Sequence, residues 1–185
     1  SGKEYCINLI DDNFIIDRLN IAKEQNPDMI IVFMHWGEEY QKSPNNEQVR
    51  LANLLFENGV NVILGSHPHV LQKMEKVDLA DGKEGFVIYS LGNFMSGQVK
   101  ENTRDSIILN LTLTKKGTGE VKIDSAKYTP IYTYKSSAST RRYKVLDIKK
   151  ALEAFENGHK YITSSDYDLL KIEYNKILST VGDEW

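Results

Sequence analysis

The sequence predicts a mixed α/β fold, an α+β sandwich of sheets in which part of one sheet is parallel. Residues 29–34 are a continuous apolar run, a pattern typical of a strand buried on both faces, and residues 60–64 are predicted to be the next buried strand. Between them, residues 43–59 carry apolar side chains at helical spacing, so a βαβ unit with neighbouring parallel strands is expected. Residues 107–114 alternate apolar and polar, which indicates a half-exposed antiparallel strand.

The first 27 residues are predicted to form a short strand and then a helix. Residues 4–10 have the composition of a strand or extended arm. Asp11 and Asp12 offer an N-cap, and the helix should end near Pro27, which disfavours helical geometry just before it. The single cysteine, Cys6, is interpreted as a small buried hydrophobe and not as a nucleophile. One cysteine also excludes an internal disulfide and a cysteine-based zinc site.

The remainder of the chain is predicted to be mostly strand, closed by two helices. A hairpin joins two short strands, a polar loop follows, and a longer antiparallel pair comes next. In order, these elements are strands 72–77 and 85–89 around a turn at 80–83, a loop at 90–94, strands 107–114 and 120–133 around a turn at 116–119, a polar loop at 135–142, and helices 146–157 and 165–181. We assign residues 4–133 to one domain and residues 134–185 to the same domain or to an appendage.

Composition and charge exclude several classes of protein. With 41% hydrophobic and 26% charged residues, the chain has the balance of a soluble globular protein. A net charge of -3 gives no electrostatic support for binding nucleic acid. No apolar run approaches the roughly 18 to 20 residues that a membrane span needs, and no signal peptide opens the sequence.

Three histidines follow the predicted parallel strands. His35 follows the first buried run, and His67 and His69 follow the second in the motif Gly-Ser-His-Pro-His. Ligand sites of parallel sheets gather beyond the carboxyl ends of the strands, and adjacent strands lie about 4.8 Å apart. Asn93 follows a third strand at the same edge. We therefore predict a divalent-metal site there, because imidazole is a usual ligand of zinc, iron and manganese.

The two histidines around Pro68 are expected to act as a pair. Proline should hold His67 in extended geometry, so the imidazoles of His67 and His69 would lie side by side with Cα atoms roughly 6.5 Å apart. Such a pair can serve one metal ion, or each of two ions about 3.5 to 4 Å apart. Each histidine alone has a simpler interpretation as a hydrogen-bonded surface residue, and only the three together favour a metal. His159 is interpreted as a solvated loop residue.

Other residues near these motifs keep two interpretations. Glu38 and Glu39 are either partners of the metal ligands or charges at a helix start. Trp36, Tyr40 and Phe94 form either a wall facing a substrate or ordinary aromatic packing beside the site.

Three motifs lie in order along the chain: Met-His-Trp-Gly-Glu-Glu-Tyr at 34–40, Gly-Ser-His-Pro-His-Val-Leu-Gln at 65–72 and Tyr-Ser-Leu-Gly-Asn-Phe at 89–94. Together they resemble the bacterial CapA/PgsA family of capsule synthesis proteins, which are linked to poly-γ-glutamate and related in fold to calcineurin-like metallophosphoesterases. The resemblance covers roughly residues 4–133. It implies an αββα fold, two sheets flanked by helices, with a two-metal centre.

The resemblance also implies roles for the histidines. His35 and His67 would bind one divalent ion and His69 a second, with Asn93 nearby; Mn, Fe, Zn and Mg all stay open. Further ligands are implied from an N-terminal half, namely an Asp-x-His motif, a bridging aspartate and an Asn-His pair, and neither of the two sequence motifs occurs here. Three neutral imidazoles bring no charge to offset divalent cations. The chain is therefore expected to be the C-terminal part of a longer protein and inactive alone.

Two functions stay open at this stage. One is a metal-dependent hydrolase, active at full length on a phosphoester or on a bond in a capsule polymer. The other is a non-catalytic accessory protein for the synthesis, anchoring or export of an anionic polymer such as poly-γ-glutamate. The loop 135–142 either contacts this polymer or is an ordinary solvated loop. Both functions imply the capsule synthesis machinery and the missing N-terminal half as partners. The resemblance also implies a place on the outer side of the cell envelope, anchored through a segment outside this sequence.

Overall fold

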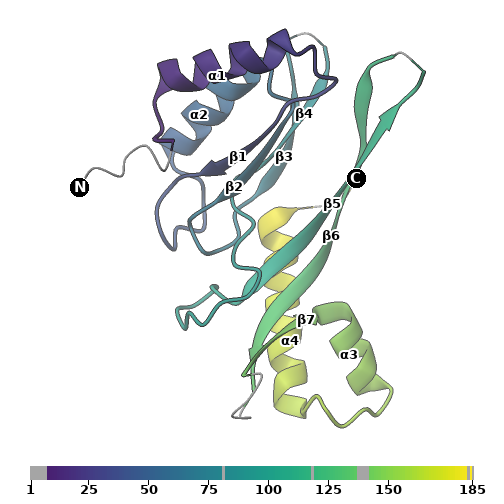
Figure 1. Ribbon diagram of the computed structural model, residues 1–185. Coiled ribbons are helices and arrows are strands. Elements are labelled where there is room, and N and C mark those ends of the chain that lie inside the picture. Colours follow the sequence, from purple (N-terminus) through teal and green to yellow (C-terminus); the bar gives the residue numbers. More distant parts are fainter. Residues whose placement is uncertain (1–7, 81, 118, 137–141, 183, 185) are drawn as a thin grey trace.

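The computed structural model describes residues 8–80, 82–117, 119–136, 142–182 and 184. Within them the chain forms two β-sheets and four helices (Figure 1), so the predicted mixed α/β fold is confirmed. The strand expected at 4–10 is not present at residues 8–10, which are exposed and pair with neither sheet. Residues 4–7, including Cys6, lie outside the described part.

The first sheet contains the expected βαβ unit. Its strands are β1 (Ile31–His35), β2 (Val62–Ser66), β3 (Met74–Asp78) and β4 (Glu84–Ile88), in the order β1-β2-β4-β3. β1, β2 and β4 are parallel, and β3 pairs antiparallel with β4 as the predicted hairpin. In the register of β1 and β2, His35 lies opposite Ser66. The carboxyl ends of the two strands therefore meet at one edge of the sheet.

Two helices, α1 (Asp12–Glu24) and α2 (Asn46–Glu57), cover one face of this sheet (Figure 1). Each begins at a residue that caps free backbone N–H groups. Asp11 accepts from the Phe14 N–H at 2.8 Å, and Asn45 and Gln48 form a reciprocal capping box. These caps explain why both helices start where the sequence places them.

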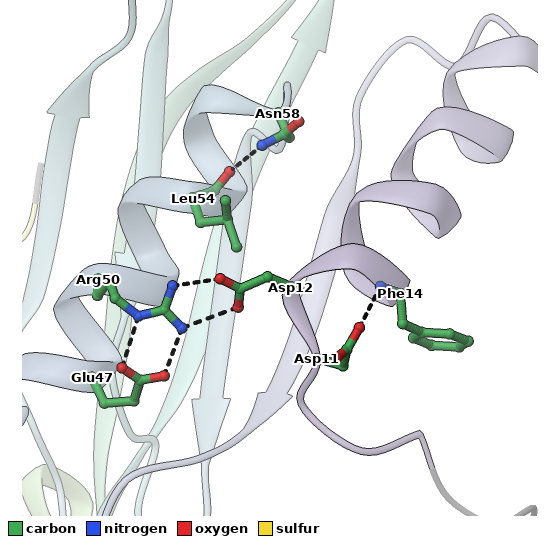
Figure 2. A network of polar contacts seen from close by, with 7 residues as sticks. All are labelled: Asp11, Asp12, Phe14, Glu47, Arg50, Leu54 and Asn58. Atoms are coloured by element: carbon green, nitrogen blue, oxygen red, sulfur yellow. Dashed lines mark hydrogen bonds and ion pairs between the residues drawn. The ribbon is translucent and has the colours of Figure 1, made fainter.

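Arg50 ties the two helices together on their outer side (Figure 2). Its guanidinium donates to both carboxylate oxygens of Asp12 on α1, at 2.7 and 3.0 Å, and to Glu47 on α2. Hydrogen bonds from Arg50 lower the pKa of both carboxyl groups. The fork of the guanidinium thus spans two elements that are far apart in the sequence.

The second sheet contains one strand that the sequence did not predict. Its order is β5-β6-β7, with β5 (Asp105–Lys115), β6 (Val121–Lys135) and β7 (Tyr143–Asp147), followed by α3 (Ile148–Glu156) and α4 (Ser164–Val181). β7 occupies residues 143–145, to which no element was assigned, and the first two residues of the predicted helix 146–157; it forms because the end of β6 offers a partner. Residues 137–141 of the predicted polar loop lie outside the described part. No described helix is both long and apolar enough to span a bilayer.

The other face of the first sheet is only partly covered. Val62, Phe86 and Ile88 share a buried core with the second sheet, α3 and α4. On β1, by contrast, the side chain of Phe33 is 76% exposed, and Ile31 is also exposed. The prediction that this apolar run is buried on both faces is therefore wrong. β1 is an edge strand, and none of the described residues covers its second face.

Candidate metal centre

The structure brings His35, His67 and His69 together at the carboxyl edge of the first sheet. His67 Nδ1 lies 2.9 Å from His35 Nε2, and the centroids of these two rings are 4.6 Å apart. The His69 ring lies 6.1 Å from that of His67. The three side chains come from the ends of β1 and β2, as their sequence positions indicated, and their role as metal ligands stays a prediction.

A turn, and not an extended strand, presents the histidine pair. The φ angles of His67 and His69 are 97° and 62°, values that residues other than glycine rarely adopt. The extended geometry expected before Pro68 is therefore wrong, because the chain bends as soon as β2 ends. Tyr40, itself at φ 69°, donates its backbone N–H to the Pro68 carbonyl at 2.8 Å. The loop after β1 thus holds the turn after β2 in a conformation that costs about 1 to 3 kcal/mol per strained residue.

Ser66 contacts the nitrogen of His35 that faces away from His67. The Ser66 hydroxyl donates to the Met34 carbonyl at 3.1 Å, so its lone pairs face His35 Nδ1 at 3.4 Å. A neutral His35 that carries its proton on Nδ1 has its Nε2 lone pair directed at His67. Ser66 was not among the predicted site residues, although parallel pairing of β1 and β2 would have placed it opposite His35.

Asn93 orients His69 in a similar way. The Asn93 amide nitrogen donates to Gln98 Oε1 at 2.9 Å and to the Thr103 carbonyl at 3.1 Å, which leaves its oxygen toward His69 Nδ1, 2.9 Å away. His69 therefore carries a proton on Nδ1, and its Nε2 is available to a ligand. Holding one ring nitrogen by a hydrogen bond is the usual way in which proteins orient a metal-binding histidine.

The two acidic residues and Tyr40 lie on the exposed side of the histidines. Glu39 Oε1 is 3.9 Å from His69 Nε2, whereas Glu38 accepts from the Asn45 side chain at 3.5 Å. The Tyr40 ring stacks on His69 with centroids 6.0 Å apart. Desolvation, with a hydrogen bond to Glu39, raises the pKa of the Tyr40 phenol. Glu39 is thus the carboxylate nearest to the candidate ligands on this side.

Trp36 lies behind the site and not in it. Its side chain is 2% exposed, stacks on Tyr89 and donates from Nε1 to the Tyr89 carbonyl at 2.9 Å. Gly65 makes this contact possible, because a Cβ there would lie 2.0 Å from the same carbonyl oxygen. Trp36 therefore has the packing role, whereas Phe94 is exposed. His159 is also exposed, in the loop between α3 and α4.

The buried amides of Gln48 and Gln72 brace the loop that follows β1. Gln48 Nε2 donates to Gln72 Oε1 at 2.8 Å, and Gln72 Nε2 donates to the carbonyls of Gln41 and Ser43 at 2.8 and 3.1 Å. Both side chains are fully buried. Sequence periodicity did not single them out, because a polar residue on a helix such as α2 is ordinarily expected to face solvent.

The donor set fits one metal ion in part. Two nitrogen ligands of a tetrahedral zinc ion lie roughly 3.3 Å apart, because each is about 2.0 to 2.1 Å from the ion. The 2.9 Å between His35 Nε2 and His67 Nδ1 is a hydrogen-bond distance, about 0.4 Å shorter than that spacing, so the two rings would separate slightly around an ion. His69 lies beside the pair and not at the same point. Among the described residues, no group of three or more His, Cys, Asp or Glu side chains is placed to hold a metal ion.

Comparison with known proteins identifies related sequences. The family model described as bacterial capsule synthesis protein PGA_cap matches residues 4–98. The PGA biosynthesis protein CapA of Bacillus subtilis (strain 168) is 37% identical over 130 residues, which cover 69% of this chain and 33% of that protein. The capsule biosynthesis protein CapA of Bacillus anthracis is 38% identical over 103 residues, 56% of this chain and 24% of the relative. The chain thus spans a third or less of these curated relatives.

Proposed function

Because this chain belongs to the bacterial capsule synthesis protein family, we propose that it carries half of a metal centre that hydrolyses a bond in an anionic capsule polymer or a phosphoester. Poly-γ-glutamate is the polymer that we propose. The observation that carries this proposal is the pair of ring nitrogens of His35 and His67, 2.9 Å apart at the end of two parallel strands. We also propose that the protein works at the outer side of the cell envelope with the capsule synthesis machinery.

Each histidine has a defined part in this centre. His35 would bind one divalent ion through Nε2 and His67 the same ion through Nδ1, and His69 would offer Nε2 to a second ion. Ser66 and Asn93 hold the opposite ring nitrogens of His35 and His69, so these two imidazoles are oriented before any ion binds. A divalent ion bound there would supply Lewis acidity and lower the pKa of water.

The remaining ligands would come from outside these 185 residues. Two divalent cations need carboxylates for charge balance, and Glu39 Oε1 lies 3.9 Å from His69 Nε2. The uncovered face of β1 supports this inference, since Ile31, Phe33 and His35 alternate onto the same side of the strand and all are exposed. A further part of the polypeptide that covered Ile31 and Phe33 would reach His35 as well.

Metal analysis of the complete protein that contains this chain tests the proposal. We expect one to two divalent ions per chain in the wild type, and loss of metal and of turnover in the double variant His67→Ala plus His69→Ala. His159→Ala is the matched control and should retain both. Absence of metal from the complete wild-type protein would remove the proposed centre. Stoichiometric metal without hydrolysis of phosphodiesters or of poly-γ-glutamate would instead favour an accessory role in polymer synthesis, anchoring or export.

A further inference from the structure

The loop 93–102, between β4 and β5, exposes apolar side chains beside the candidate metal centre. Phe94, Met95 and Val99 are 61%, 60% and 73% exposed. In Figure 1 this loop is the teal segment that leads into β5 and projects away from the sheets. Single apolar residues on a surface are ordinary, but three exposed ones within six positions are typical of a surface that binds another molecule.

Hydrogen bonds hold this loop in a defined shape. The Asn93 amide closes it by donating to Gln98 and to the Thr103 carbonyl, and the Thr103 hydroxyl donates to the Lys100 carbonyl at 2.7 Å. The Thr133 hydroxyl on β6 donates to the Phe94 carbonyl at 3.4 Å. Because Asn93 also contacts His69, the loop is attached directly to the candidate centre.

Lys100 adds a positive charge to the same surface. Its ammonium lies 3.6 Å from the centroid of the Tyr40 ring, and Tyr40 stacks in turn on His69. Within the part of the chain that the structure describes, no acidic side chain forms an ion pair with Lys100, whereas the neighbouring Glu101 lies 3.9 Å from Lys42. A cation fixed by an aromatic ring remains able to bind an anion from solvent.

We propose that Lys100, Tyr40 and the exposed side chains of the loop 93–102 form the binding surface for the capsule polymer. Lys100 binds a carboxylate of the polymer, Tyr40 positions Lys100, and Phe94, Met95 and Val99 contact the methylene groups between carboxylates. A ligand that alternates carboxylates with short runs of methylene groups matches this mixture of one cation and three apolar side chains. The inference rests on the proposed function, because that function supplies the polymer.

Titration of the 185-residue chain with poly-γ-glutamate in EDTA tests the binding surface without any metal. We expect Lys100→Ala to weaken binding roughly fivefold, the loss expected for one exposed charge-assisted contact. Lys171→Ala is the matched control, because Lys171 also lies over a tyrosine, 5.5 Å from the ring centroid of Tyr167, but on α4. It should bind like the wild type. Equal affinities for Lys100→Ala and wild type, or no binding by the wild type, would overturn the proposal.

The apolar contacts are tested with a second polymer and a second variant. Polyaspartate has one methylene group per side chain and should bind the wild type more weakly than poly-γ-glutamate. The double variant Phe94→Ser plus Val99→Ser should bind both polymers equally, and a preference that persisted would contradict the assignment of these side chains. Unchanged thermal unfolding midpoints would show that the exposed substitutions leave the fold intact. Binding to anionic lipid vesicles and not to either polymer would identify a membrane surface and overturn the inference.

The two proposals fail separately. An absence of polymer binding in EDTA would refute the proposed binding surface, and it would leave the metal analysis of the histidine variants unaffected. Absence of metal from the complete protein removes the centre, whereas polymer binding that depends on Lys100 would still stand. A surface that only packs against another part of the protein would show no dependence on Lys100 in the titration.

Discussion

One row of side chains across the first sheet is buried at one end and exposed at the other. Phe33, Leu64 and Ile88 are neighbours in the register of β1, β2 and β4, so they share a face. Ile88 is fully buried against the second sheet, whereas Phe33 is 76% exposed. The apolar character of the row is the same throughout, and only the covering differs. The uncovered end also carries His35, so a segment that covered Phe33 would lie beside His35 as well.

The largest expected effect comes from truncating the two ends of this face. In the 185-residue chain, Phe86→Ala should lower the free energy of unfolding by about 3 to 5 kcal/mol, because it opens a cavity in a sealed core. Phe33→Ala should change it by less than about 0.5 kcal/mol, because that ring is already solvated. Urea unfolding of both variants measures the difference. Similar losses would show that β1 is covered in solution.

The same substitution in the complete protein sharpens the comparison. If another part of the polypeptide covers β1, Phe33→Ala should then cost about 2 to 4 kcal/mol and should also weaken metal retention at His35. A loss that stayed near zero in the complete protein would mean that β1 is a true exposed edge.

A buried carboxyl group on the packed side gives the next effect. Asp105, on β5, is buried, and desolvation is the main reason that its pKa rises to about 6; Glu173 raises it further, whereas its own backbone N–H, Lys176 and Lys42 lower it. The folded chain therefore binds a proton more tightly than the unfolded chain, and stability falls as the pH rises from about 4 through 6. Asp105→Asn removes this loss.

We expect Asp105→Asn to be more stable than the wild type by roughly 1 to 3 kcal/mol at pH 7.5, with the gap closing at pH 4. Urea unfolding at several pH values measures it. Asp168→Asn, which removes an exposed carboxyl group, is the control variant. A constant difference between Asp105→Asn and the wild type across the range would contradict the assignment.

The smallest effect is expected at the solvent-exposed ion pairs of Arg50, which link α1 to α2. Arg50→Ala should lower the thermal unfolding midpoint slightly at low salt and not measurably at high salt, because exposed ion pairs are screened. The Arg50 guanidinium lowers the pKa of Asp12 and of Glu47, so its contribution is present above the ordinary carboxyl pKa and is lost as the pH falls below it. Arg18→Ala, which removes contacts to Asp17 and Phe14 within α1 and none to α2, should have less effect. Equal shifts for the two variants would show that Arg50 does not couple the helices.

Part of the candidate site could be predicted from local pattern alone. Apolar runs ending in His35 and in the His67-His69 motif specified two parallel strands with their carboxyl ends together, and the structure places the rings accordingly. The backbone of that motif could not be predicted in the same way. The preference of Pro68 for an extended neighbour is overridden at His67, because the loop around Tyr40 and the close approach at Gly65 hold the turn.

The sequence by itself determined the βαβ unit, the capped starts of α1 and α2, and which chemical groups stand at the ends of β1 and β2. Hydrophobic periodicity and helix capping depend on residues only a few positions apart, so both can be recognised in the sequence. The tertiary structure alone decided that β7 pairs with β6, that Phe33 stays exposed, and that the Tyr40 ring contacts both Lys100 and His69. Each of these features depends on contacts between segments that are far apart in the sequence. The packing of whole helices and strands decides which of those segments meet.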